Sequence, residues 1–243
     1  MKDGRYYDNK HLYFMGDLHG ALGRLRGFFH YGKHDDTLLI CVGDIEMGIM
    51  KESMVHRVFT TLDKRLSDIN SHVILMRGNH DDPYYWSGVD AYTNIKFIDN
   101  EYIYTNNRLM LLVGGAVSVD RAIREEGHDW WRGEGVNYDF IDKVIETDRK
   151  HEVDYLITHA SYVFPPALAE SEGFLRIQKA IDAEEELSRE LREEREHLKR
   201  LVDYVNPGTY VHGHYHSRER HSTPSMGIIS LGEQEYFKAN NKA

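Results

Sequence analysis

The sequence predicts an α/β protein in which two mixed β-sheets pack face to face as a sandwich flanked by helices. Strand-like and helix-like segments alternate over the first half of the chain, which is typical of parallel strands joined by helices. After Pro83, strand-like segments follow one another with short turns, which favours further sheet. Polar residues cluster where the apolar segments end. We expect residues 1–243 to form a single domain.

The first-half elements are recognised by the spacing of their apolar residues. Residues 21–31 and 51–66 repeat apolar side chains at helical spacing and are predicted helices. Strands are expected at 11–15, 37–42 and 73–76. The second of these is continuously apolar, as in a strand covered on both faces.

The second half is predicted to be richer in strands. The expected strands are 95–98, 102–104, 109–113, 155–158 and 210–212. Residues 137–148 are a predicted helix. Residues 226–231 and 235–238 are expected to form a closing hairpin.

A long charged helix is predicted at about 176–205. Glu185–Arg189 and Glu196–Arg200 are glutamate-first pairs at helical spacing, and Pro207-Gly208 would end the helix. Its leucines form a near-heptad stripe that Glu184 and Glu194 interrupt. One interpretation docks this helix on the body with a solvated charged face. In the other, it projects and pairs with a partner or a second copy of the chain.

Bulk composition narrows the function classes. The net charge of −10 makes long nucleic acid an unattractive partner. The single cysteine, Cys41, lies in an apolar run and is expected to be a buried thiol. There is no signal-peptide pattern and no apolar run near the ~20 residues of a membrane span. We therefore expect a cytoplasmic protein with no membrane partner.

Five short polar motifs carry the chemistry, and most directly follow a predicted strand. They are Gly16-Asp17-Leu18-His19-Gly20, Gly43-Asp44, Gly78-Asn79-His80-Asp81, Thr158-His159 and Gly213-His214-Tyr215-His216. Ligands gather beyond the carboxyl ends of parallel strands, which is where these motifs stand. Carboxylate oxygen and neutral imidazole nitrogen suit divalent cations, and the glycines let the backbone approach an ion closely.

Each motif alone has a plainer explanation. Asp17 and His19 could belong to a surface loop, Gly78-Asn79 could form a tight turn, and His159 could be a structural histidine at a strand end. The agreement of residue type, order and position across all five favours a two-metal site.

The full set resembles the calcineurin-like metallophosphoesterase superfamily. Its pattern of Asp-x-His, Gly-Asp, Gly-Asn-His-Asp/Glu, His and Gly-His-x-His is matched from residue 16 to residue 216. The first and third motifs are especially similar to the branch with serine/threonine phosphoprotein phosphatases and dinucleoside tetraphosphate hydrolases. The last motif is closer to the general branch.

The resemblance implies a binuclear metal centre. Asp17, His19 and His216 would hold the first ion, and Asn79, His159 and His214 the second, while Asp44 would bridge both. Mn²⁺ is the expected metal, with iron, zinc, nickel or magnesium as alternatives. The fold implied is the two-sheet sandwich.

The resemblance also implies a mechanism. Hydroxide bridging the two ions attacks the phosphorus of a mono- or diester, with His80 as the general acid beside Asp44. Arg77 and Asn79 are candidate substrate-binding residues. Arg77 could equally pair with a nearby carboxylate.

The chain departs from the family pattern at one motif. The family usually reads Gly-Asp-x-x-Asp, and the second Asp orients the acid histidine; the matching position here is Met47. The phosphatase branch then has an arginine where this chain has Gly48. Glu46 is one place out of register, so either it reaches His80 or His80 lacks a carboxylate partner.

The segment after Gly114 offers further polar candidates. Arg121 and Arg124 could each meet a phosphate or form surface salt bridges. Trp130-Trp131 could stack on a substrate base, cap the cleft, or fill the core.

Two functions from different classes remain. The first is a metal-dependent phosphoesterase acting on a phosphorylated protein, nucleotide or small molecule. The second is a non-catalytic binding scaffold on the same fold that uses the 176–205 helix, including as a homo-oligomer contact.

Overall fold

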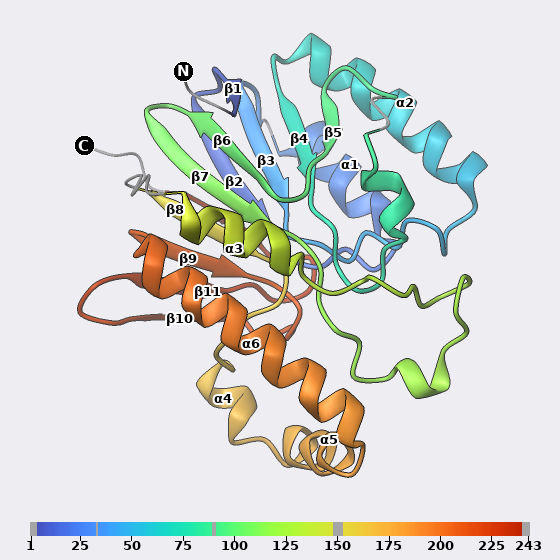
Figure 1. Cartoon of the computed structure of the whole chain (residues 1–243). Coiled ribbons are helices and arrows are strands. Elements are labelled where there is room, and N and C mark those ends of the chain that lie inside the picture. The colour runs from blue at the N-terminus through green and yellow to red at the C-terminus, as the bar shows by residue number, and fades with distance from the viewer. Residues whose placement is uncertain (1–3, 33, 89–90, 148–152, 240–243) are drawn as a thin grey trace.

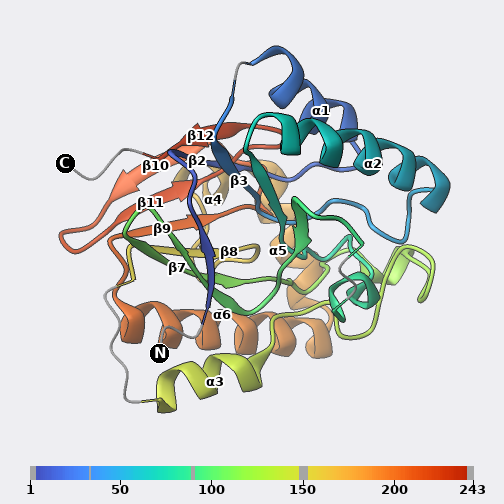
Figure 2. The same ribbon diagram turned by 90° about the horizontal axis from the view of Figure 1, so that it is seen from above.

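The computed structural model of the protein describes residues 4–32, 34–88, 91–147 and 153–239. Two β-sheets lie face to face between two layers of helices (Figures 1 and 2). Helices α1 (Leu22–Tyr31) and α2 (Glu52–Asp68) cover one side, and α3 (Tyr138–Glu146) and α6 (Glu185–Val205) cover the other. The predicted two-sheet α/β architecture is confirmed. Residue 148 of the predicted third helix lies outside the described residues.

The smaller sheet has the order β12-β2-β3-β4-β5. Its strands are β2 (His11–Met15), β3 (Thr37–Cys41), β4 (His72–Leu75), β5 (Ile95–Phe97) and β12 (Tyr236–Lys238). Neighbours from β2 to β5 pair in parallel, and β12 runs antiparallel to β2. All of β3 is buried, as its continuous apolar run predicted.

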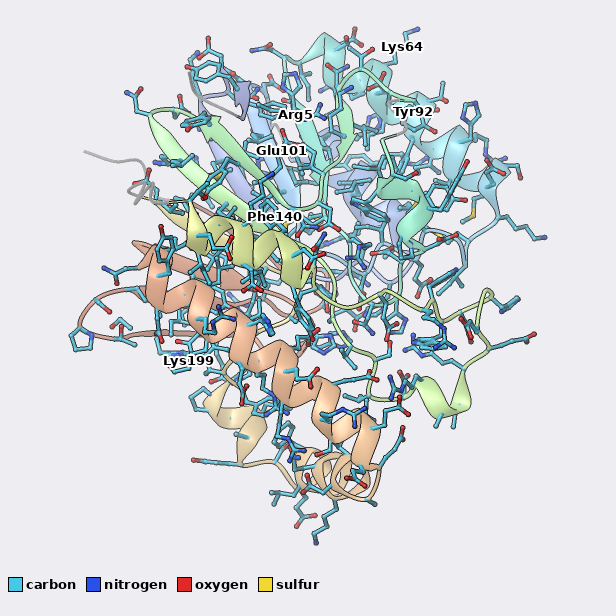
Figure 3. All side chains as sticks on the ribbon, in the orientation of Figure 1. Arg5, Lys64, Tyr92, Glu101, Phe140 and Lys199 are labelled. Atoms are coloured by element: carbon cyan, nitrogen blue, oxygen red, sulfur yellow. The ribbon has the colours of Figure 1, made fainter. Side chains whose placement is uncertain are left out.

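The larger sheet has the order β1-β6-β7-β8-β9-β11-β10. Its strands are β1 (Arg5–Tyr7), β6 (Glu101–Thr105), β7 (Arg108–Val113), β8 (Tyr155–Thr158), β9 (Thr209–His212), β10 (Glu219–Ser222) and β11 (Gly227–Ser230). The two edge strands β1 and β10 were not predicted, because β1 is three residues long with only Tyr7 in the core and β10 is polar throughout. The Arg5 guanidinium pairs with Glu101 at 3.2 Å across the β1–β6 edge (Figure 3).

The expected closing hairpin is wrong. β11 pairs in parallel with β9 in the larger sheet, whereas β12 pairs with β2 in the smaller one. The connecting residues cross between the sheets and bind the start of the first motif: Gln234 N–H donates to the Asp17 carbonyl, and Gly16 N–H to that of Glu235, both at 2.9 Å. A crossing of this kind leaves both strand patterns unchanged, so periodicity could not distinguish it from a hairpin.

Three apolar layers hold the sandwich together. Phe14, Ile40, Met110 and others fill the space between the sheets. A second layer seals α1 and α2 against the smaller sheet, and a third seals α3 and α6 against the larger one. Phe140 on α3 packs half-buried against this third layer (Figure 3). Each layer removes apolar surface from water and so fixes the strand ends in space.

The predicted helix at 176–205 is two helices. α5 (Glu172–Asp182) ends before Glu184, whose backbone is extended and begins α6. A shorter helix, α4 (Pro166–Ala169), precedes them. Elsewhere in the described chain, η1 (Pro83–Trp86) and η2 (Arg121–Ile123) are short 3₁₀ helices. Asn206, in the left-handed conformation, caps α6 one residue before Pro207.

The leucine stripe of α6 faces the body of the same chain. Leu187, Leu191, Leu198 and Leu201 are buried. α6 is therefore docked on the body of the chain, as the first interpretation predicted, and does not project from it. Among the described residues, no helix is long and apolar enough to cross a membrane.

Glu194, which interrupts the stripe, has a structural role. Its carboxylate is buried, and its Oε1 accepts a hydrogen bond from the Val117 backbone N–H at 2.9 Å. Burial raises the pKa of Glu194 to about 7. The side chain thus ties α6 to the loop after β7 at the cost of burying an acid.

Replacing Glu194→Gln should make stability less dependent on pH. The folded chain holds the Glu194 proton up to about pH 7, whereas the unfolded chain releases it near 4.5, so wild-type stability falls as pH rises between these values. We expect the variant to match the wild type near pH 5 and to exceed it by about 1–3 kcal/mol at pH 8. Urea unfolding at both pH values measures this. The exposed Glu196→Gln on the same helix is the control, and equal pH profiles for wild type and Glu194→Gln would contradict the idea.

Candidate metal centre

The five polar motifs meet at one end of the sandwich because they follow strands that run in the same direction. β2 leads to Asp17 and His19, β3 to Asp44, and β4 to Asn79 and His80. From the other sheet, β8 leads to His159 and β9 to His214 and His216. These loops turn tightly: φ is 41° at His19, 49° at Asp44, 67° at His214 and 50° at His216. Such left-handed conformations are uncommon outside glycine and cluster at functional sites.

One group of ligand-type side chains contains Asp17, His19, Asp44 and His216, whose ligand atoms lie within 4.8 Å of one another. His216 Nε2 is 3.0 Å from Asp17 Oδ2 and 2.9 Å from His19 Nε2. His19 Nε2 is 3.7 Å from Asp44 Oδ2. These are the residues that the sequence assigned to the first ion, with the bridging carboxylate.

The second group adjoins the first through Asp44. Asn79 Oδ1 lies 3.1 Å from His159 Nε2 and 3.0 Å from His214 Nδ1. His159 Nε2 is 3.2 Å from Asp44 Oδ1. All seven residues proposed from the sequence as ligands are therefore brought together, across both sheets.

Several ligand-type atoms face one another with lone pairs, an arrangement that a cation between them would stabilise. His159 Nδ1 lies 2.7 Å from the Val42 carbonyl oxygen, which only an N–H can satisfy. In the neutral ring, Nε2 is then a lone pair that faces the oxygens of Asn79 and Asp44. A proton or a metal ion resolves this contact, and a ring N–H donating to a backbone carbonyl is the usual arrangement of a metal-bound histidine.

Electrostatics show the same need for positive charge. Burial alone would raise the pKa of Asp44, but His159 and then His80 hold it well below its usual range. Burial would lower the pKa of His159, yet the Asp44 carboxylate raises it to about 10. Burial and the neighbouring His159 lower the pKa of His214 to about 3, so this ring is neutral and free to coordinate.

Asp81, the last residue of the third motif, joins two of the site loops, a role that the sequence analysis did not predict. Its buried carboxylate accepts backbone N–H bonds from Ile45 at 3.1 Å, Met47 at 3.0 Å and Gly78 at 2.8 Å. It thereby fastens the Asp44 loop to the Asn79 loop. Met47, at the position of the expected second Asp, is buried in the apolar layer beneath α1 and α2. An aspartate directly after the Asn-His pair was the signal for this role.

His80 is flanked by an arginine. Arg124 Nη2 lies 2.7 Å from His80 Nε2, and Arg124 Nη1 lies 3.2 Å from His80 Nδ1. Asp44 Oδ2 is 4.0 Å from His80 Nε2. Glu46 lies 3.6 Å from His19 Nδ1 and, with His19 and His80, forms a third group within 4.8 Å. Burial is the main cause that lowers the pKa of His80; Asp44 opposes it and Arg124 adds to it.

Arg77 has the environment described by the ion-pair alternative. Its Nε donates to Asp99 Oδ2 at 2.9 Å, and its terminal nitrogens donate to the carbonyls of Gly133, Glu134 and Gly135. The side chain is buried. In this structure Arg77 fastens the 133–135 segment to the strand end of β4.

The segment after Gly114 sends its candidates in different directions. Arg121 pairs with Glu184 and Glu190 of the α6 region, so it turns away from His80. Trp131 is half-buried, and its ring atom Cζ2 would lie 2.9 Å from a Cβ placed on Gly48. The indole therefore packs on the Gly48 backbone and anchors this segment over the Asp44 loop.

Gly78 allows the loops to close around Asp44. A Cβ at this position would lie 2.1 Å from Asp44 Oδ1, 2.4 Å from Asp44 N and 2.8 Å from His159 Nε2. The first and third of these contacts are to the side chains of Asp44 and His159, through which the two groups of ligand-type residues adjoin. Only glycine leaves the carboxylate in place.

We expect Gly78→Ala to displace Asp44, to lower the free energy of unfolding by about 1–3 kcal/mol and to reduce bound metal. Thermal unfolding and elemental analysis after Mn²⁺ loading measure the two effects. Gly23→Ala in α1, where an added Cβ meets nothing within 4 Å, is the control and should be neutral or stabilising by up to about 1 kcal/mol. Full metal content in Gly78→Ala would contradict this account.

The family model for the calcineurin-like phosphoesterases matches residues 10–218. The chain belongs to this family. Membership makes it a metal-dependent phosphoesterase in general terms, and the ligand groups above lie within the matched span. No curated protein matches the sequence.

Solved structures share the fold at low identity. One crystal structure aligns with 96% of this chain and 99% of its own, with a TM-score of 0.54 and 10% identity. The phosphopantetheinyl hydrolase from Mycobacterium tuberculosis aligns over 92% and 90% of the two chains (TM-score 0.46, 15% identity). The cold-active protein-tyrosine phosphatase of a psychrophilic Shewanella species aligns over 99% and 78% (TM-score 0.43, 15% identity). At 10% identity the first of these likenesses concerns the fold alone.

Proposed function

We propose that this family member hydrolyses phosphate mono- or diesters at a centre of two divalent cations, with Mn²⁺ preferred and iron, zinc, nickel or magnesium as alternatives. Asp17, His19 and His216 would hold one ion, Asn79, His159 and His214 the other, and Asp44 would contact both. The observation that carries this proposal is that the seven side chains form two adjoining groups at the strand ends, joined through Asp44.

Bound to these residues, two divalent cations would supply a water of lowered pKa and would neutralise charge on the phosphoryl oxygens. The protein's contribution is to hold the donors in place. The backbone N–H groups of Leu18 and His19 donate to the Asp44 carbonyl at 3.1 and 2.8 Å, and His80 N–H donates to Asp44 Oδ1 at 2.9 Å. Asn79 Nδ2 donates to Ser118 Oγ at 3.0 Å, which turns Asn79 Oδ1 toward the histidines.

His80 would protonate the leaving oxygen. Its ring is partly open to solvent and borders Asp44. A general acid must hold a proton, and the pKa of His80 is lowered in the ligand-free protein. An anionic phosphoester beside the ring would raise the pKa of His80 and so favour its protonated, imidazolium form.

The activity is tested with metal-stripped protein reloaded with Mn²⁺, using p-nitrophenyl phosphate and bis(p-nitrophenyl) phosphate. We expect metal-dependent release of p-nitrophenol from at least one ester. Asp44→Asn should reduce the rate to background, because the variant loses the charge shared by the two groups. Asp68→Asn, on the exposed end of α2, is the control. No turnover of either ester by protein with metal confirmed bound would count against phosphoesterase activity.

The role of His80 is tested by varying the leaving group. His80→Ala should slow hydrolysis of a phenyl or alkyl phosphate by about 10²–10⁴-fold and of p-nitrophenyl phosphate by less, because a good leaving group needs little protonation. The rates of wild type and His80→Ala are compared at equal metal content. His128→Ala, on the exposed part of the same region, should leave both rates unchanged. An equal effect on all leaving groups would remove His80 from the acid role.

A further inference from the structure

We propose that Arg124 is the phosphate-binding residue of this site: its guanidinium receives the phosphoryl oxygens of a phosphoester or of inorganic phosphate beside His80. This inference rests on the proposed function and assigns a cationic substrate contact to a loop outside the five motifs. It concerns a phosphoryl anion as ligand, whatever the rest of the substrate.

The position of Arg124 is the first argument. Its two terminal nitrogens reach both ring nitrogens of His80, at 2.7 and 3.2 Å, and His80 borders the shared carboxylate Asp44. The guanidinium therefore stands at the edge of the two ligand groups. Arg77 and Arg121 are directed elsewhere by their own partners.

The present partners of Arg124 leave it able to bind an anion. A neutral imidazole can accept at only one of its two nitrogens, so the pair of contacts to His80 cannot both be hydrogen bonds. The carboxylate partner is Asp120, with Oδ2 at 2.7 Å and a side chain 41% exposed. A phosphoryl group offers several charged acceptor oxygens, which suit the planar guanidinium fork better than an imidazole does.

The surroundings strengthen such a contact and hold it in place. The Arg124 side chain is only 9% exposed, so its charge is weakly screened by water. The backbone carbonyl of Asp129 lies 3.3 Å from Nη1. Trp131 fixes the same loop by packing on Gly48, directly over the Asp44 loop. The loop that carries Arg124 is therefore held against the site by a second contact, that of Trp131 with Gly48.

The test measures phosphate binding as well as turnover. Inorganic phosphate is titrated into Mn²⁺-loaded wild type, Arg124→Met and Arg124→Lys by calorimetry, with metal content and melting temperature checked for each. We expect Arg124→Met to weaken phosphate binding by about 10–100-fold, as for loss of a charged hydrogen bond, and Arg124→Lys to lie between. Arg132→Met is the matched control: Arg132 lies on the same loop in an exposed pair with Glu126 and should bind phosphate normally.

Kinetics separate direct binding from an effect through His80. Loss of a phosphate contact lowers the rate to a similar extent for all leaving groups, whereas an effect through His80 changes the leaving-group dependence. Phosphate affinity of Arg124→Met within twofold of wild type would overturn the proposal, and so would a wild type that binds no phosphate. A wild type that binds phosphate through Arg124 but hydrolyses no ester would refute the proposed function and leave this inference standing.

Discussion

The burial of the Asp44 charge is the constraint on which the rest of the site depends. A carboxylate removed from water is costly unless other groups compensate it. Here the compensation comes from two strand-end loops: the His80 backbone N–H of the β4 loop donates to Asp44 Oδ1, and His159 Nε2, from the other sheet, lies 3.2 Å from the same oxygen. The two sheets must pack in one register for these groups to meet. The apolar layer between them, which includes Phe14 and Ile40, therefore holds the charge arrangement in place as well as the fold.

The convergence of the proposed ligands could be predicted from the sequence because each lies shortly after a strand, whereas their division between two ions came from the family resemblance. Asp17 and Asn79 follow β2 and β4 of the smaller sheet within four residues, and His214 follows β9 of the larger sheet within two. Parallel strands in one sheet end at the same edge. Arg124 and Asp81 could not be assigned in this way. Arg124 reaches His80 from a loop whose Trp131 packs on Gly48. Asp81 accepts hydrogen bonds from backbone N–H groups that include those of the loop after β3. Contacts between loops that are distant in sequence leave no periodic signal.

The fold shows the same division between local and distant information. The buried strands and the helices α1 and α2 were predicted nearly to the residue, since apolar spacing determines them. The break before α6 was not, because Glu184 and the residues around it favour a helix by composition yet adopt an extended turn. Nor was the assignment of β11 and β12 to different sheets predicted. It is accompanied by hydrogen bonds between the crossing segment and residues 16 and 17, which are distant from it in sequence.

The family match ends at residue 218, before the strands that finish both sheets. β11 covers the open side of β9, and β12 covers that of β2. A chain cut after the match would keep every proposed ligand but would expose two unpaired strand edges, which are templates for aggregation. The strands exposed in this way, β2 and β9, lead into the first and last motifs. The strands after residue 218 are thus part of the folded unit that positions the motifs.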